Sequence, residues 1–263
     1  MLSIAKSSRG FSAICGVAAL GFALTIVLSN ALLVPAGLPA TGAGPGEVHA
    51  FFRTEDGALG AGSALTPLAW VLATLFGAGA VAALRPSERG RSEAWSLVGF
   101  AGLLLQNAAF AGVVAIRLAL GAAAGQGDRP AAGLWALHEA LFTLNGTFLA
   151  LALLGLSVAG LRAGLIRPWH GGLGLLSAAL LFGSAVLAPW IVGSGGPLGL
   201  LGLTGWLMWV VWVAAYGVAL IRPARHHPSA GETKGCADRP RTADRPGGRG
   251  GRPGTRHTAP GTA

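Results

Sequence analysis

Charged residues are scarce in this sequence, and their scarcity excludes an ordinary soluble domain. Asp, Glu, Lys and Arg together make up 11% of the 263 residues, whereas a soluble domain usually carries about 25%. Hydrophobic residues make up 52%, and the mean hydropathy is +0.60. This balance is typical of a protein embedded in a membrane.

Cysteine and the common catalytic motifs are also lacking. The two cysteines are Cys15, in the first apolar stretch, and Cys236, near the C-terminus, and we expect no structural disulfide between them. The sequence has no metal-binding Cys/His spacing, P-loop, Ser-His-Asp candidate or glycine-rich strand–helix turn. Haem is not expected either, because only His138 lies within an apolar stretch. We therefore expect no cofactor and a non-enzymatic role.

Six long apolar stretches stand out against this background. Each has at least 22 residues, and about 20 residues are enough for a helix to cross the hydrocarbon of a bilayer. Backbone groups inside lipid must pair within their own segment, so each stretch should be a helix. The sequence predicts an all-α fold with six transmembrane helices in an antiparallel bundle over residues 1–221. The predicted spans are 11–34, 63–84, 95–120, 134–161, 171–192 and 198–221.

Basic residues predict how the bundle is oriented. Sixteen of the nineteen lie before the first span, between spans two and three, between spans four and five, or after span six. The alternate loops carry only Arg53 and Arg129, and Arg117 lies inside a span. By the positive-inside rule, both termini are cytoplasmic. Arg outnumbers Lys by 17 to 2, and Ala and Gly are abundant, which suggests a high-GC bacterial genome and a plasma membrane location.

The C-terminal segment 222–263 is rich in Arg, Pro and Gly and has almost no apolar residues, which predicts a disordered cytoplasmic tail. Its arginines could contact anionic lipid or, less readily, RNA, or the tail could be an extension that only obeys the positive-inside rule. We favour an extension without a binding role. Membrane lipid is the second choice, and nucleic acid is an unlikely partner. The candidate lipid contacts are Arg239, Arg241, Arg245, Arg249 and Arg252.

Polar residues inside spans three and four are the best functional pointers, because placing them in lipid is costly. Counting from opposite ends of two antiparallel helices places them at matching depths and predicts a polar seam, with an Arg117–Glu139 ion pair near the outer surface. The seam could form a site for a small solute or a proton, or it could be structural hydrogen bonding between helices, which we favour. Its members are Arg117, His138, Glu139, Gln106, Asn107 and Asn145.

Two aromatic groups have more than one interpretation. Val48–Arg53, in the outer loop, could form a short interfacial helix with its aromatic side chains among the lipid headgroups. In the last span, the aromatic residues Trp206, Trp209, Trp212 and Tyr216 recur at helical spacing. They could line a pocket, but packing within the bundle or contact with lipid is the more common role of such a stripe.

Residues Arg167, Pro168, Trp169 and Gly171 form a basic–Pro–Trp–Gly turn before the fifth span, and the last span is rich in Trp and Leu. In these features the chain resembles uncharacterised bacterial six-span membrane proteins of the DUF4386 type. The resemblance implies six spans but no activity and no site residues. We expect an accessory or sensory membrane component that has membrane lipids as partners and can form helix-mediated oligomers. The alternative is a small-solute or proton-coupled transporter that uses the polar seam.

Overall fold

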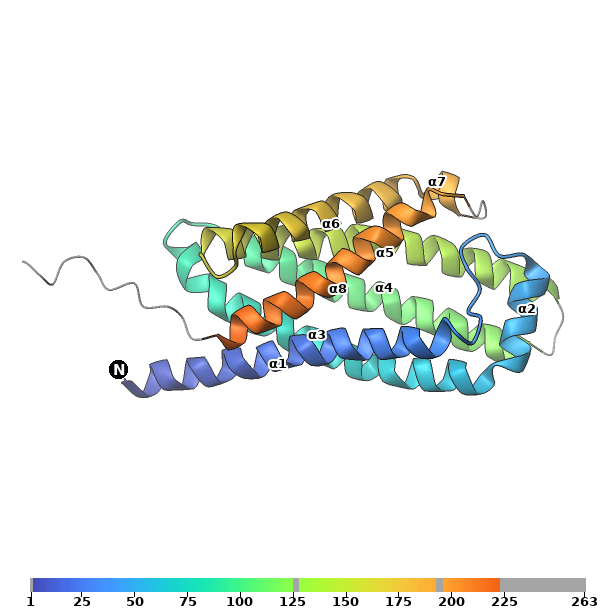
Figure 1. The fold of residues 1–263 in the computed structure, drawn as a ribbon, viewed down its shortest axis with the longest axis horizontal. Helices are drawn as coiled ribbons and strands as arrows, with labels where there is room; N and C mark the ends of the chain where they lie inside the picture. Colours follow the sequence, from blue (N-terminus) through green and yellow to red (C-terminus); the bar gives the residue numbers. More distant parts are fainter. Residues whose placement is uncertain (1, 125–127, 193–195, 223–263) are drawn as a thin grey trace, which may run out of the picture. The chain divides into compact units, whose positions relative to one another are not determined.

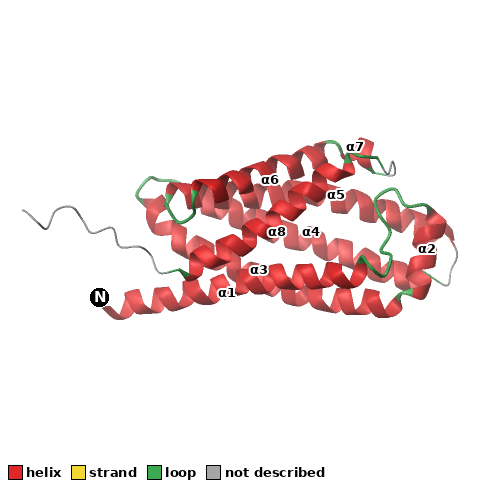
Figure 2. Cartoon of the chain, viewed as in Figure 1, coloured by secondary structure: helices red, strands yellow, loops and turns green. Residues whose placement is uncertain are grey.

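In the computed structural model, which describes residues 2–124, 128–192 and 196–222, every element of secondary structure is a helix (Figures 1 and 2). Six of the helices in the described chain are long and apolar enough to span a membrane, which confirms the predicted multi-pass, all-α fold. The helices are α1 (Leu2–Leu33), α2 (Pro45–Thr54), α3 (Asp56–Arg89), α4 (Trp95–Ala123), α5 (Asp128–Arg162), α6 (Pro168–Val186), α7 (Ala188–Ile191) and α8 (Gly199–Ile221).

The six long helices pack in a closed ring. Along the chain, α1 packs against α3, α3 against α4, α4 against α5, α5 against α6 and α6 against α8. Packing of α8 against α1 then closes the ring (Figure 1). Because the ring encloses an interior, side chains from all six helices can meet at its centre.

At one end of the ring, α2 packs against α3, α4 and α5, and we call this end the α2 end (Figure 1). The helix predicted around Val48–Arg53 is present, but its apolar side chains do not face lipid headgroups. Val48, Phe51 and Phe52 are buried against residues of α3, α4 and α5, and the rings of Phe52 and Trp135 lie 6.3 Å apart between centroids. The interfacial placement of these aromatics was wrong because the ring supplies an apolar surface that the sequence of the loop does not show.

The fifth predicted span, 171–192, is interrupted near its end. The helix α6 stops at Val186, and the short α7 follows at once, with Pro189 in its first turn. Proline has no backbone N–H and its ring clashes with the carbonyl four residues earlier, which kinks or breaks a helix and favours the interruption seen here. The 19 residues of α6 still give about 28 Å of helix, close to the thickness of a bilayer core.

The half of the ring away from α2 is filled by a packed aromatic core. Phe76 of α3 and Trp212 and Tyr216 of α8 are almost completely buried there, with ring centroids 4.9 to 6.3 Å apart. The prediction that the aromatic stripe of the last span packs within the bundle is confirmed for Trp212 and Tyr216, whereas Trp206 and Trp209 line the pocket that was the alternative. This half of the interior is therefore filled by large side chains.

The five arginines predicted to contact lipid (Arg239, Arg241, Arg245, Arg249 and Arg252) lie outside the described residues. The predicted tail, 222–263, is outside them as well, apart from Arg222.

Candidate functional site

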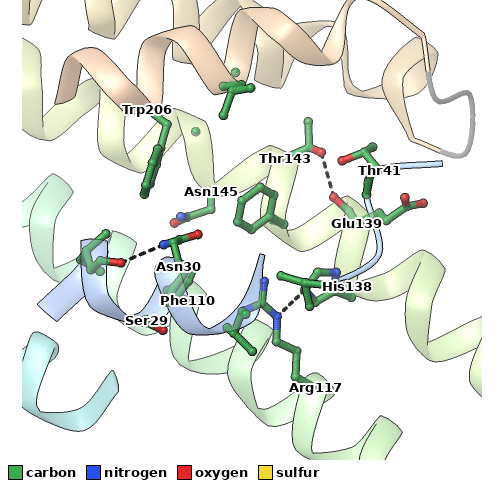
Figure 3. Close-up of a pocket in the computed structure, with 18 of the residues that line it drawn as sticks. Ser29, Asn30, Thr41, Phe110, Arg117, His138, Glu139, Thr143, Asn145 and Trp206 are labelled. Carbon is green, nitrogen blue, oxygen red and sulfur yellow. Dashed lines mark hydrogen bonds between the residues drawn. The ribbon is translucent and has the colours of Figure 1, made fainter. Parts of the chain in front are cut away.

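A cavity of about 650 Å³ lies inside the ring, in the half nearer the α2 end (Figure 3). Every long helix contributes to its wall, and so do residues 38–41 in the loop between α1 and α2. Cavities that hold small molecules commonly measure about 300–1,000 Å³ and combine apolar walls with a few polar groups. This cavity has both the size and the mixed lining.

Five of the six predicted seam residues line this cavity: Gln106, Arg117, His138, Glu139 and Asn145. The sixth, Asn107, is directed away from it. Its side-chain amide lies 3.4 Å from the backbone oxygen of Trp70 and 3.5 Å from the hydroxyl of Thr74, both in α3. Asn107 thus joins α4 to α3, while its neighbour Gln106 faces the interior, because adjacent residues on a helix point in different directions.

The guanidinium of Arg117 is bonded to an imidazole and not to the carboxylate that was predicted. Its Nε donates a hydrogen bond of 2.9 Å to Nε2 of His138 (Figure 3). In the part of the chain that the structure describes, the ion pairs of Arg and Lys involve Glu88 and Glu93, so the predicted Arg117–Glu139 pair is wrong. Since Nε2 accepts this bond, the neutral imidazole carries its proton on Nδ1.

Glu139 instead holds the loop that precedes α2. Its Oε1 accepts a hydrogen bond from the backbone N–H of Gly42. Gly42 has a φ of 84°, a left-handed conformation that favours glycine and lets this N–H reach the carboxylate. His138 and Glu139 are consecutive on α5, so they face different directions, and His138 is the one that meets Arg117.

Aromatic side chains hold the imidazole in place. Trp135, His138 and Phe142 follow one another on the same face of α5, three and four residues apart. The ring centroids of Trp135 and His138 lie 4.5 Å apart and those of His138 and Phe142 lie 6.0 Å apart, with nearly parallel planes in both pairs. This stack fixes the ring that accepts the bond from Arg117.

Four cavity-lining side chains carry buried polar atoms with no hydrogen-bond partner among the described residues: Oε1 of Gln106, Nε1 of Trp135, Nδ1 of His138 and Oδ1 of Asn145. All four residues are only 5–7% exposed. A buried polar atom left without a partner costs roughly 1–3 kcal/mol. The cavity therefore provides places for the polar atoms of water or of a bound molecule.

Other helices bring further polar residues to the same cavity, and these were not predicted from the sequence. Figure 3 shows Asn30 of α1 and Asn145 of α5 pointing into one space. Thr25, Ser29 and Asn30 all line the cavity, and the side chains of Thr25 and Asn30 bond to carbonyls of their own helix at 2.8 and 2.9 Å. A signal was present, since Thr25 and Ser29 are four residues apart and share a face of the first span.

A comparison of the chain with protein-family models, with curated proteins and with solved structures found no match. The resemblance to the DUF4386 type therefore stays a prediction.

Proposed function

We propose that this chain is an integral membrane protein that binds a small molecule in the cavity at the α2 end, as a sensory or accessory component and not as an enzyme. The observation that carries the proposal is the lining of this cavity. A guanidinium and four buried polar atoms without described partners line an otherwise mostly apolar space. Structural hydrogen bonding alone would pair such atoms with one another.

We further propose that the membrane is a bacterial plasma membrane and that both termini are cytoplasmic. The support is the distribution of basic residues, which gather in the loops at the end opposite α2. The cavity then lies in the outer half of the bundle, where extracellular or periplasmic solutes and lipids of the outer leaflet are nearest.

The alternative is a small-solute or proton-coupled transporter that uses the same polar residues. It would need a route from the cavity to the opposite end of the ring. The buried core around Phe76, Trp212 and Tyr216 occupies that half of the interior. A transported molecule would have to displace several of these large side chains, so binding without passage is the function that the packing favours.

The proposal is tested by filling the cavity. Thr25→Phe places a ring in the cavity, whereas Leu24→Phe, at a 59% exposed neighbour that does not line it, is the matched control. The purified protein in nanodiscs is screened with small molecules by thermal stability, because a ligand that binds the folded state raises the midpoint. We expect compounds that stabilise the wild type and Leu24→Phe but not Thr25→Phe.

Stabilisation that is identical in all three proteins would overturn the proposal, because binding would then occur elsewhere. Uptake of a solute into proteoliposomes that is lost in Thr25→Phe alone would favour the transporter.

A further inference from the structure

The charged group in the cavity wall indicates which class of molecule the cavity takes. We propose, resting on the proposed function, that the ligand is an anionic amphiphile. Its planar anionic head, such as a carboxylate, sits on the guanidinium of Arg117, and its apolar body lies along the interior of the ring.

The guanidinium of Arg117 has hydrogen-bond donors that no described residue uses. A guanidinium carries five N–H donors, and His138 takes the one on Nε. The four donors on the two terminal nitrogens have no hydrogen-bond partner in the described residues. A carboxylate or phosphate fits this end of the group with two parallel hydrogen bonds, which are stronger than bonds between neutral groups.

The guanidinium also lacks a counter-charge. An arginine within a membrane-spanning helix is stable when an anion or a set of carbonyls neutralises it. Glu139 is not within ion-pair distance of Arg117, and its carboxylate is bound to Gly42. His138 is an uncharged acceptor in the tautomer that the bond requires, so the positive charge is left for a ligand.

The rest of the cavity suits an apolar body. Leu149 of α5 and Leu203, Trp206 and Trp209 of α8 contribute apolar surface to the wall. Arg117 and Gln106 are 11 residues apart on α4, about 16 Å along the helix axis. An eight-carbon chain that starts at Arg117 is shorter than this distance, so it can lie wholly inside the cavity.

The experiment compares three probes that differ only in their head group: octanoate, octanol and octylamine. Each is titrated into the full chain in nanodiscs of zwitterionic phosphatidylcholine, and affinity is taken from the rise in thermal midpoint. We expect octanoate to bind more tightly than octanol, and octylamine to bind least. Thr25→Phe should abolish the binding of octanoate.

Two substitutions should change the affinity for octanoate in opposite directions. Arg117→Leu removes charged hydrogen bonds and should weaken octanoate about 10- to 100-fold, with little change for octanol. Glu139→Gln keeps an oxygen for the N–H of Gly42 but removes a negative charge from the cavity wall, so it should strengthen octanoate several-fold. Leu118→Gln, at a 51% exposed neighbour of Arg117 that does not line the cavity, is the matched control and should change neither probe.

A second arm separates a free acid from a lipid headgroup, since both offer the same chemistry. Nanodiscs that contain anionic phosphatidylglycerol are titrated with octanoate in the same way. Weaker apparent affinity in these discs for the wild type, with no such change in Arg117→Leu, would identify lipid as an occupant. Unchanged affinity would identify the free amphiphile.

If octanoate and octanol bind with equal affinity and Thr25→Phe abolishes the binding of both, the proposal that the ligand has an anionic head group is wrong. The proposal that the cavity binds a small molecule would remain. Preference for octylamine would overturn it in favour of a cation at Glu139. Binding of all three probes that is unaffected by Thr25→Phe would overturn both proposals. If Arg117→Leu does not fold, the three-probe comparison in the wild type and the gain in Glu139→Gln still decide the matter.

Discussion

At the scale of single residues, the carboxylate of Glu88 has a structural role that the sequence did not indicate. Glu88 lies in the last turn of α3 and is completely buried. Its Oε1 accepts the backbone N–H of Ser96 at 2.6 Å, and its other oxygen accepts the hydroxyl of the same residue. It thereby satisfies a free N–H in the first turn of α4, where the N-cap residue, Ala94, has no side chain able to do so.

We predict that Glu88→Ala destabilises the protein by ~1–3 kcal/mol, because two hydrogen-bond donors of Ser96 lose their acceptor in a buried site. Denaturant unfolding in detergent measures this loss. Glu93→Ala is the control, since Glu93 pairs with Arg91 and Arg162 at a more exposed position, and such pairs contribute only ~0–1 kcal/mol. Equal losses in the two variants would show that Glu88 does not support the start of α4.

A second prediction concerns how Arg117 is coupled to α5. A double-mutant cycle on thermal stability with Arg117→Leu and His138→Phe should give a coupling energy of ~0.5–3 kcal/mol, because the two side chains share a hydrogen bond. The same cycle with Arg117→Leu and Glu139→Gln should give a smaller coupling energy, because these two groups share no hydrogen bond or ion pair and interact only as more distant charges. The reverse result would restore the ion pair that counting along the helices predicted.

At the scale of helices, glycine brings α4 and α5 close together. A Cβ on Gly155 would lie 2.3 Å from the backbone nitrogen of Gly99, and one on Gly102 would lie 2.5 Å from that of Ala152. Backbone atoms cannot move aside as a flexible side chain does, so these positions require glycine. Small residues that allow this approach are a general feature of helix packing in membranes.

Gly155→Ala should therefore destabilise the protein markedly, by ~2 kcal/mol or more, as overpacking against a rigid neighbour does. Gly133→Ala in the same helix is the matched control, because nothing lies within 4 Å of its Cβ, and it should be neutral or slightly stabilising. Thermal midpoints in one detergent compare the two. A loss as large for Gly133→Ala would indicate an effect of the substitution on helix α5 itself and not on its packing.

The helices themselves could be predicted from sequence, but their contacts could be predicted only in part. Apolar length alone gave the six spans, because lipid leaves the backbone no other regular structure. Depth along the chain correctly brought Gln106, Arg117, His138 and Asn145 to one region, since all four line the same cavity. The sequence did not reveal how each helix is rotated about its own axis. This rotation determines that His138 and not Glu139 meets Arg117, and that Gln106 and not Asn107 faces the cavity. The burial of Phe51 and Phe52 depends on three other helices, so no local pattern revealed it.

At the scale of the whole molecule, the ring of six helices divides its interior into two parts. Aromatic side chains fill one part, and the cavity occupies the other. Charged side chains follow the same division. Arg85, Arg91 and Arg162 pair with glutamates at the end away from α2, whereas Arg117 faces the cavity. The division of the paired arginines and of Arg117 between the two ends of the bundle thus coincides with the asymmetry of its interior.

The final prediction is the topology, since it decides from which side a ligand reaches the cavity. Reporter fusions after Arg91 and after Arg167 should be cytoplasmic, because the basic residues around them resist transfer across the membrane. Fusions near Gly57 and Gly127 should be external. A matched pair tests the cause: replacing Arg85, Arg89 and Arg91 together should weaken the preference for this orientation, whereas replacing Arg53 should strengthen it or leave it unchanged. If any one of the four fusions reports the opposite side, the arrangement with both termini cytoplasmic is wrong, and the cavity would then be filled from a different compartment or leaflet.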